Sequence, residues 1–138
     1  MKVVLDTNIL VSGTFWKGDS DKIIEIIDKG EVELILCKEL IDEYFDVINR
    51  DEIIDKIKNK NLVLNKSIHN IINNSNLVVP LEKFDIIKED SDDNVVLECA
   101  VEGKVDYIVT QDNHILKLGE FQGIKIITPE EFLKLGFN

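Results

Sequence analysis

The sequence predicts an α/β fold, in which a mostly parallel sheet lies between two layers of helices. Two observations predict this class. Short apolar runs of strand length recur along the chain, for example Val3 to Leu5 and Tyr107 to Val109. Longer segments with helical spacing of apolar residues separate these runs. We find no linker or internal repeat, and we therefore expect one domain over residues 1–138.

Five strands are expected, each an apolar run of the kind found in strands that are buried on both faces. Pro80 ends the third strand, because proline lacks the N–H group that a sheet ladder requires. The expected strands are residues 2–5, 32–36, 77–79, 107–109 and 124–127.

Helices are expected between these strands, with a loop at 14–20 after a first helix that follows Asn8. Gly30 and Gly103 each follow the end of a helix, and Pro129 lies in the first turn of the last one. The remaining expected helices are 19–29, 38–49, 51–58, 64–74, 92–102, a short one near 115–118, and 129–135.

The chain is strongly acidic, with 27 acidic and 16 basic residues and a formal charge of −11. This balance argues against a large basic surface for nucleic acid, and fits a cation site, a basic partner or solubility alone. No apolar run approaches the about 20 residues of a membrane helix, and no signal peptide is expected. Cys37 and Cys99 lack metal-ligand spacing, and we expect reduced core thiols in a cytoplasmic protein.

Carboxylates follow two of the expected strands. Asp6 comes directly after Leu5, and Thr110 and Asp112 follow the strand that ends at Val109. The carboxyl ends of parallel strands share one edge of a sheet, where ligands bind in open α/β folds. The two acids are therefore candidates for one pocket, although Asp6 has the alternative role of capping the next helix.

The most acidic segment, 89–94, opens a helix, where acidic residues are also favoured by capping and by the helix dipole. Asp93 differs from a solvent-facing cap because it shares a helix face with Leu97 and Ala100, which must pack on the sheet. A buried carboxylate is costly unless it is paired. We therefore expect Asp93 to join the two strand-end acids around Mg²⁺ or Mn²⁺, which prefer oxygen ligands.

A fourth pocket acid is expected from helix 38–49. Glu43 borders the apolar stripe of this helix and is the best candidate, but helical periodicity leaves Asp42 and Asp46 open. Neither histidine is assigned a chemical role. His69 is expected to be a surface or packing residue, and for His114 a substrate contact is the less favoured alternative.

Four segments together resemble the PIN domain family of metal-dependent ribonucleases, in particular the toxin components of toxin–antitoxin systems (VapC-like ribonucleases). They occur in the family's order and span nearly the whole chain. The segments are VVLDTNILVSG at 3–13, KELIDEYFDVINR at 38–50, DSDDNVVLECA at 90–100 and YIVTQD at 107–112.

The resemblance implies a five-stranded parallel sheet in the order 3-2-1-4-5 and a set of acids that bind the metal and catalyse hydrolysis. The implied metal-binding and catalytic acids are Asp6, Glu43, Asp93 and Asp112. The supporting polar residues are Asn8, Ser12 and Thr110, together with the extra acids Asp90 and Asp92.

The implied activity is cleavage of RNA phosphodiester bonds that leaves a 5′-phosphate and a 3′-hydroxyl. The implied partners are the RNA, a small basic antitoxin and a second copy of the chain, because paired protomers would supply a basic groove. The segment 56–60 is a candidate basic guide for RNA, with a solvated helix surface as the alternative. The other functions considered are a non-catalytic PIN domain that binds a partner and an aspartyl-phosphate phosphatase or receiver-like domain.

Overall fold

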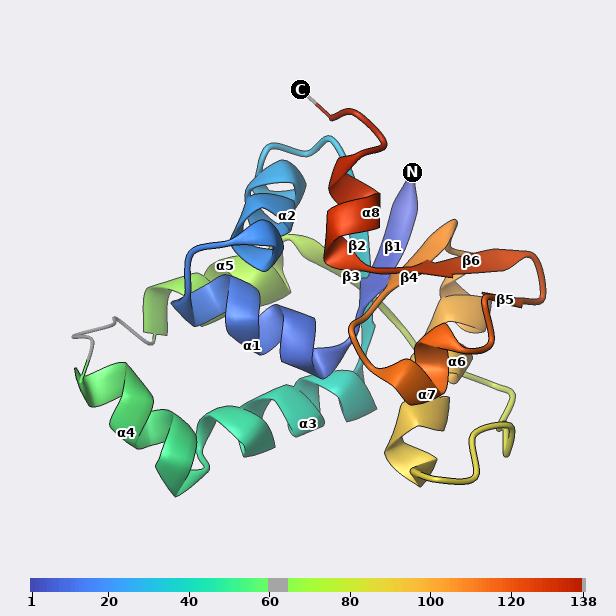
Figure 1. Ribbon diagram of the computed structural model, residues 1–138, viewed down its shortest axis with the longest axis horizontal. Coiled ribbons are helices and arrows are strands. Elements are labelled where there is room, and N and C mark those ends of the chain that lie inside the picture. Colours follow the sequence, from blue (N-terminus) through green and yellow to red (C-terminus); the bar gives the residue numbers. More distant parts are fainter. Residues whose placement is uncertain (60–64, 138) are drawn as a thin grey trace.

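A computed structural model describes residues 1–59 and 65–137 (Figure 1). Within these residues, a six-stranded sheet runs in the order β3-β2-β1-β4-β6-β5. Every neighbouring pair is parallel except β5 with β6. The strands are β1 (Lys2–Leu5), β2 (Glu33–Cys37), β3 (Ser75–Val78), β4 (Tyr107–Val109), β5 (Glu120–Phe121) and β6 (Ile124–Ile127). The predicted parallel sheet of order 3-2-1-4-5 is confirmed as β3-β2-β1-β4-β6.

The antiparallel edge strand β5 was not predicted. It forms a hairpin with β6, and the two loop residues Gln122 and Gly123 have φ values of 50° and 83°. Positive φ at both central positions is the backbone of a type I′ turn, which matches the twist of the flanking strands. A two-residue strand is too short to show alternation in the sequence, so only its pairing with β6 reveals it.

The helices agree with the predicted segments to within a few residues, apart from the first. Helix α1 extends through Phe15, so the predicted loop at 14–20 is too long. The Thr14 hydroxyl donates to the Leu10 carbonyl at 2.6 Å and lies 2.7 Å from the Tyr44 hydroxyl, which holds this last turn in place. The predicted start of the fifth helix at Leu64 lies outside the described residues. The helices are α1 (Thr7–Phe15), α2 (Asp19–Asp28), α3 (Lys38–Ile48), α4 (Asp51–Asn59), α5 (Asn65–Asn73), α6 (Ser91–Gly103), α7 (Asn113–Leu116) and α8 (Pro129–Leu133).

Helices cover both faces of the sheet (Figure 1). Helix α6 packs along β1, β2, β3 and β4, whereas α1 and α2 lie on the opposite side. The central strands β1, β2 and β4 are buried after their first residues, as the apolar runs predicted, and Cys37 and Cys99 are free thiols within this core. In the part of the chain that the structure describes, no helix has the length and apolar composition of a membrane span.

The segment 79–90 has no regular secondary structure and is held against α6 by two buried side chains. The amide of Asn94 accepts hydrogen bonds from the N–H groups of Ile86 and Ile87 and donates one to the Ile87 carbonyl. Glu98 accepts a further backbone N–H from the same segment at 3.0 Å. These bonds satisfy backbone groups of the segment that would otherwise be left unpaired, and they hold the segment against α6.

Helix α6 approaches β2 closely at its last residue, Gly103. A Cβ atom at this position would lie 2.5 Å from Cγ2 of Ile35. We expect Gly103→Ala to destabilise the protein by about 1–3 kcal/mol, because overpacking a dense core outweighs the better helix propensity of alanine. Urea unfolding followed by circular dichroism measures this change.

A double-mutant cycle identifies the cause of the expected loss. In an Ile35→Ala background the clashing methyl group is absent, so Gly103→Ala should cost much less than it does in the wild type. An equal cost in both backgrounds would show that the Gly103 effect does not come from this contact.

Candidate active site

The ends of β1 and β4 meet at the carboxyl edge of the sheet. Leu5 pairs with Val109, so the residues that follow these strands are neighbours. The buried Thr110 hydroxyl donates to Oδ2 of Asp6 at 2.8 Å and accepts the backbone N–H of Asp112 at 3.0 Å. One threonine therefore connects the two strand-end acids that the sequence singled out.

Asp6 does not cap the helix that it precedes. It occupies the N-cap position of α1, but its carboxylate makes no capping hydrogen bond, and the residue is only 6% exposed. By contrast, Asp90 caps α6 through the N–H of Asp92, and Asp112 caps α7 through the N–H of His114. Asp90 and Asp112 therefore act as helix caps, whereas the carboxylate of Asp6 is not used in capping.

Asp93 lies in the first turn of α6 and is 7% exposed, on the same buried side as Leu97 and Ala100. Its Oδ2 atom is buried and has no hydrogen-bond partner among the described residues. A buried carboxylate oxygen without a donor is costly unless a cation neutralises it. This unpartnered oxygen indicates that the site is built to hold a positive charge.

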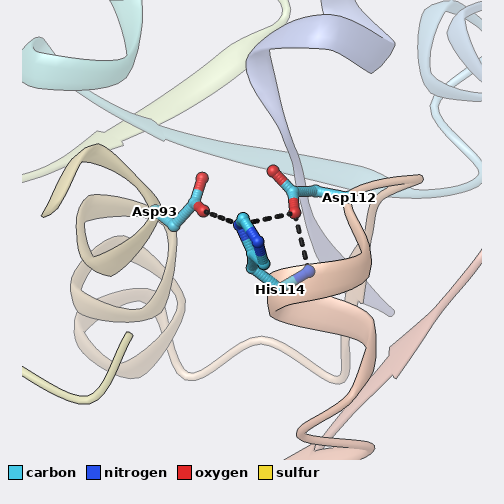
Figure 2. Close-up of side chains that lie close together, drawn as sticks. All are labelled: Asp93, Asp112 and His114. Carbon is cyan, nitrogen blue, oxygen red and sulfur yellow. Dashed lines mark hydrogen bonds and ion pairs between the residues drawn. The ribbon is translucent and has the colours of Figure 1, made fainter. Parts of the chain in front are cut away.

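His114 lies next to the carboxylates of Asp93 and Asp112, and the sequence interpretation did not include it among the site residues. Figure 2 shows its ring between the carboxylates of Asp93 and Asp112, with Nδ1 lying 3.8 Å and 3.7 Å from their nearer oxygens. One donor atom from each of the three residues lies within 4.8 Å of the others. The sequence signal was the position of His114 two residues after a strand-end aspartate.

Glu43 is the acid of α3 that lies near these groups. Burial raises its pKa, and the charges of Asp6, Asp92 and Asp90 raise it further, although the nearby Thr7 hydroxyl opposes the shift. The two acids left open by periodicity lie on the exposed side of the helix. Asp42 pairs with Lys38 at 2.7 Å, and Asp46 lies 3.9 Å from Arg50. Tertiary structure thus favours Glu43 over both alternatives.

We refer to Asp6, Glu43, Asp93 and Asp112 as the acidic cluster. Burial raises the pKa of Asp6, and the charges of Asp112 and Asp90 add to this, although the Thr110 hydrogen bond opposes it. Burial raises the pKa of Asp93 to about 7, with further contributions from Asp112, Asp90 and Asp6. A shared cation would relieve the repulsion that contributes to the raised pKa values of Asp6 and Asp93.

The structure gives no side-chain hydrogen bond with the acidic cluster for three of the predicted supporting residues. Asn8 is exposed and Ser12 is half-buried, and their side chains form no hydrogen bond with the described residues. Asp92 and His69 are exposed. Supporting roles for Asn8, Ser12 and Asp92 therefore stay predictions.

The acidic cluster fits a divalent cation. Its donors are carboxylate oxygens, the ligands that Mg²⁺ and Mn²⁺ prefer, and one of these oxygens, Oδ2 of Asp93, accepts no hydrogen bond from the described residues. The PIN domain family model matches residues 2–114, from β1 to the first turn of α7. The chain belongs to the PIN domain family. PIN domains are generally nucleases that use a divalent metal, in agreement with the acidic group found in this PIN domain. A comparison with curated protein sequences found no match.

The pH dependence of stability tests the repulsion within the acidic cluster. An acid whose pKa is higher in the folded state than in the unfolded chain binds protons more readily in the folded state, so the folded state becomes more stable as the pH falls. For Asp93 this destabilisation is complete above pH 7 or so and declines as the pH falls towards the unfolded value of 3.8. We therefore expect the metal-free PIN domain to gain about 1–2 kcal/mol between about pH 8 and pH 5, allowing for solvent screening at the sheet edge.

Urea unfolding in the presence of EDTA, at several pH values, measures this gain. Asp93→Asn should flatten the dependence and raise the stability at neutral pH, whereas Asp55→Asn, which replaces an exposed acid of α4, should follow the wild type. A wild-type stability that falls steadily as the pH drops from 8 to 6 would contradict the expected repulsion.

Proposed function

We propose that this PIN domain, over residues 1–138, is a metal-dependent endoribonuclease that hydrolyses RNA phosphodiester bonds. The observation that carries the proposal is the buried, unpartnered Oδ2 of Asp93, which faces Asp112 at the carboxyl edge of a PIN-type sheet. Ligands bind at this edge in open α/β folds. The alternative receiver-like function gains no observation of its own from this geometry.

The residues of the acidic cluster have separate tasks in this proposal. Asp93 and Asp112 would hold Mg²⁺ or Mn²⁺. Asp6 and Glu43 would add negative charge next to the ion, which they would contact directly or through a water molecule. Thr110 keeps Asp6 and Asp112 in position through its two hydrogen bonds. A bound divalent cation supplies a Lewis acid for the attack of water on the phosphodiester. The products would then carry a 5′-phosphate and a 3′-hydroxyl.

The strongly acidic surface needs a partner for RNA binding in this proposal. The chain has a formal charge of −11. The candidate basic guide at 56–60 has two exposed lysines, Lys56 and Lys58, and Lys60 lies outside the described residues. We propose that a homodimer assembles the basic groove that one chain lacks.

We also propose that the protein acts in the cytoplasm as the toxin of a toxin–antitoxin pair. A small basic partner that reaches the acidic cluster would hold it inactive.

Incubation of the purified protein with a mixture of structured RNAs tests the nuclease proposal. Cleavage is expected with Mn²⁺ and should stop with EDTA, and the ends of the products identify the chemistry. A protein that binds Mn²⁺ and RNA but leaves every RNA intact would instead be a non-catalytic PIN domain. Trapping by beryllium fluoride without any RNA cleavage would favour the receiver-like alternative.

The antitoxin proposal has its own test, capture of partners from the native host with the full chain as bait. A small protein rich in Arg or Lys is expected, and adding it should inhibit RNA cleavage. Recovery of only acidic small partners, or of none, would contradict the toxin assignment without affecting the nuclease proposal.

A further inference from the structure

His114 occupies a defined position beside the two best-placed acids. It lies in the single turn of α7, where its backbone N–H donates to Oδ1 of Asp112 at 2.8 Å. The next residue, Ile115, is fully buried and anchors this turn to the core. The imidazole itself is about half exposed, with 47% of the side chain accessible, so an ion can reach it from solvent.

The ring is close to both carboxylates but hydrogen-bonded to neither. Its Nδ1 atom lies 3.8 Å from Oδ2 of Asp93 and 3.7 Å from Oδ1 of Asp112. Hydrogen bonds from nitrogen to oxygen span about 2.7–3.2 Å, so both ion-pair contacts of the ring are longer than direct hydrogen bonds. The Asp93 oxygen that faces the ring is the buried one that accepts no hydrogen bond from the described residues.

These separations suit ligands of one metal ion. Ligand atoms about 2.1 Å from an ion lie about 3.0 Å apart when they are adjacent in an octahedral site, and about 4.2 Å apart when they are opposite. The two observed distances fall between these limits. Small side-chain rotations would therefore complete a site with two carboxylates and one imidazole.

We propose that His114 donates a ring nitrogen to the cation held by Asp93 and Asp112, and that this nitrogen makes the site prefer Mn²⁺, Co²⁺ or Ni²⁺ over Mg²⁺. Imidazole is a good ligand for transition metals, whereas Mg²⁺ prefers oxygen and retains its water. Affinity for nitrogen-containing sites increases from Mn²⁺ to Ni²⁺, so the preference should be largest for Ni²⁺. The inference rests on the proposed metal site and adds which ion that site selects.

Calorimetric titration of the untagged protein with MgCl₂, MnCl₂ and NiCl₂ tests the proposal. The wild type should bind Ni²⁺ and Mn²⁺ more tightly than Mg²⁺. The Ni²⁺ affinity of His114→Gln should be at least about 10-fold lower than that of the wild type. A loss of this size is typical when a residue that only hydrogen-bonds a metal ligand is removed, and loss of a ligand should cost no less. Its Mg²⁺ affinity should change much less. His69→Gln, which replaces the exposed histidine of α5, is the matched control and should behave as the wild type.

Asp93→Asn separates failure of this inference from failure of the metal site. If Asp93→Asn weakens binding of all three ions while His114→Gln keeps the wild-type preference, the metal site holds and the role of His114 is wrong. If Asp93→Asn leaves all three affinities unchanged, the metal site itself is misplaced and both proposals fail. Circular dichroism of each metal-free variant verifies that it is folded.

Discussion

Replacing Asp6 by Asn is expected to abolish RNA cleavage while leaving the fold intact. Asparagine preserves the shape of the side chain and an oxygen that can accept the Thr110 hydrogen bond, but it removes the negative charge beside the metal site. We expect the rate of cleavage with Mn²⁺ to fall at least about 100-fold, because even residues behind the metal ligands contribute about 10–100-fold.

Stability distinguishes this effect from unfolding. Burial raises the pKa of Asp6, so the charged carboxylate is unfavourable in the metal-free fold, and Asp6→Asn should melt at or above the wild-type temperature. Asp42→Asn, which changes an exposed acid of α3, should cleave RNA at the wild-type rate. Full activity of a folded Asp6→Asn protein, on an RNA that the wild type cuts, would remove Asp6 from the mechanism.

Metal binding is expected to produce the largest change in thermal stability. A cation that binds only the folded state adds about 2.7 kcal/mol at 100 times its dissociation constant. For a domain of this size the melting temperature should rise by about 8–12 °C. The buried, unpartnered oxygen of Asp93 and the neighbouring charge of Asp112 are the physical reason, because the ion relieves both.

Asp93→Asn tests this explanation, since one substitution removes a ligand and a source of repulsion. The variant should melt at a higher temperature than the wild type without metal, and its Mn²⁺ shift should be much smaller. Scanning calorimetry with Mn²⁺ and with EDTA gives both values, and Asp55→Asn should show the full wild-type shift. An identical Mn²⁺ shift in the wild type and in Asp93→Asn would mean that Asp93 only completes the first turn of α6.

Local patterns in the sequence predict the parallel part of the fold, which is confirmed, and the sheet edge at which three acids of the acidic cluster lie. Continuous apolar runs specify strands that are buried on both faces, and an acid directly after such a run must lie at the carboxyl edge. Asp6 and Asp112 are such acids, since each follows a buried strand of the parallel sheet. The inward orientation of Asp93 followed from helical spacing with Leu97 and Ala100, and all three are buried.

Residues with equivalent local patterns are distinguished by the packing of the elements. Asp42, Glu43 and Asp46 lie on one amphipathic helix, and the packing of α3 determines which of them lies near Asp6. The two-residue strand β5 exists through its pairing with β6 rather than through any periodicity of its own. His114 became a candidate ligand because α6 brings Asp93 to within 3.8 Å of it. Local sequence specifies which way a residue faces on its own element, but contacts between distant segments depend on how the elements pack.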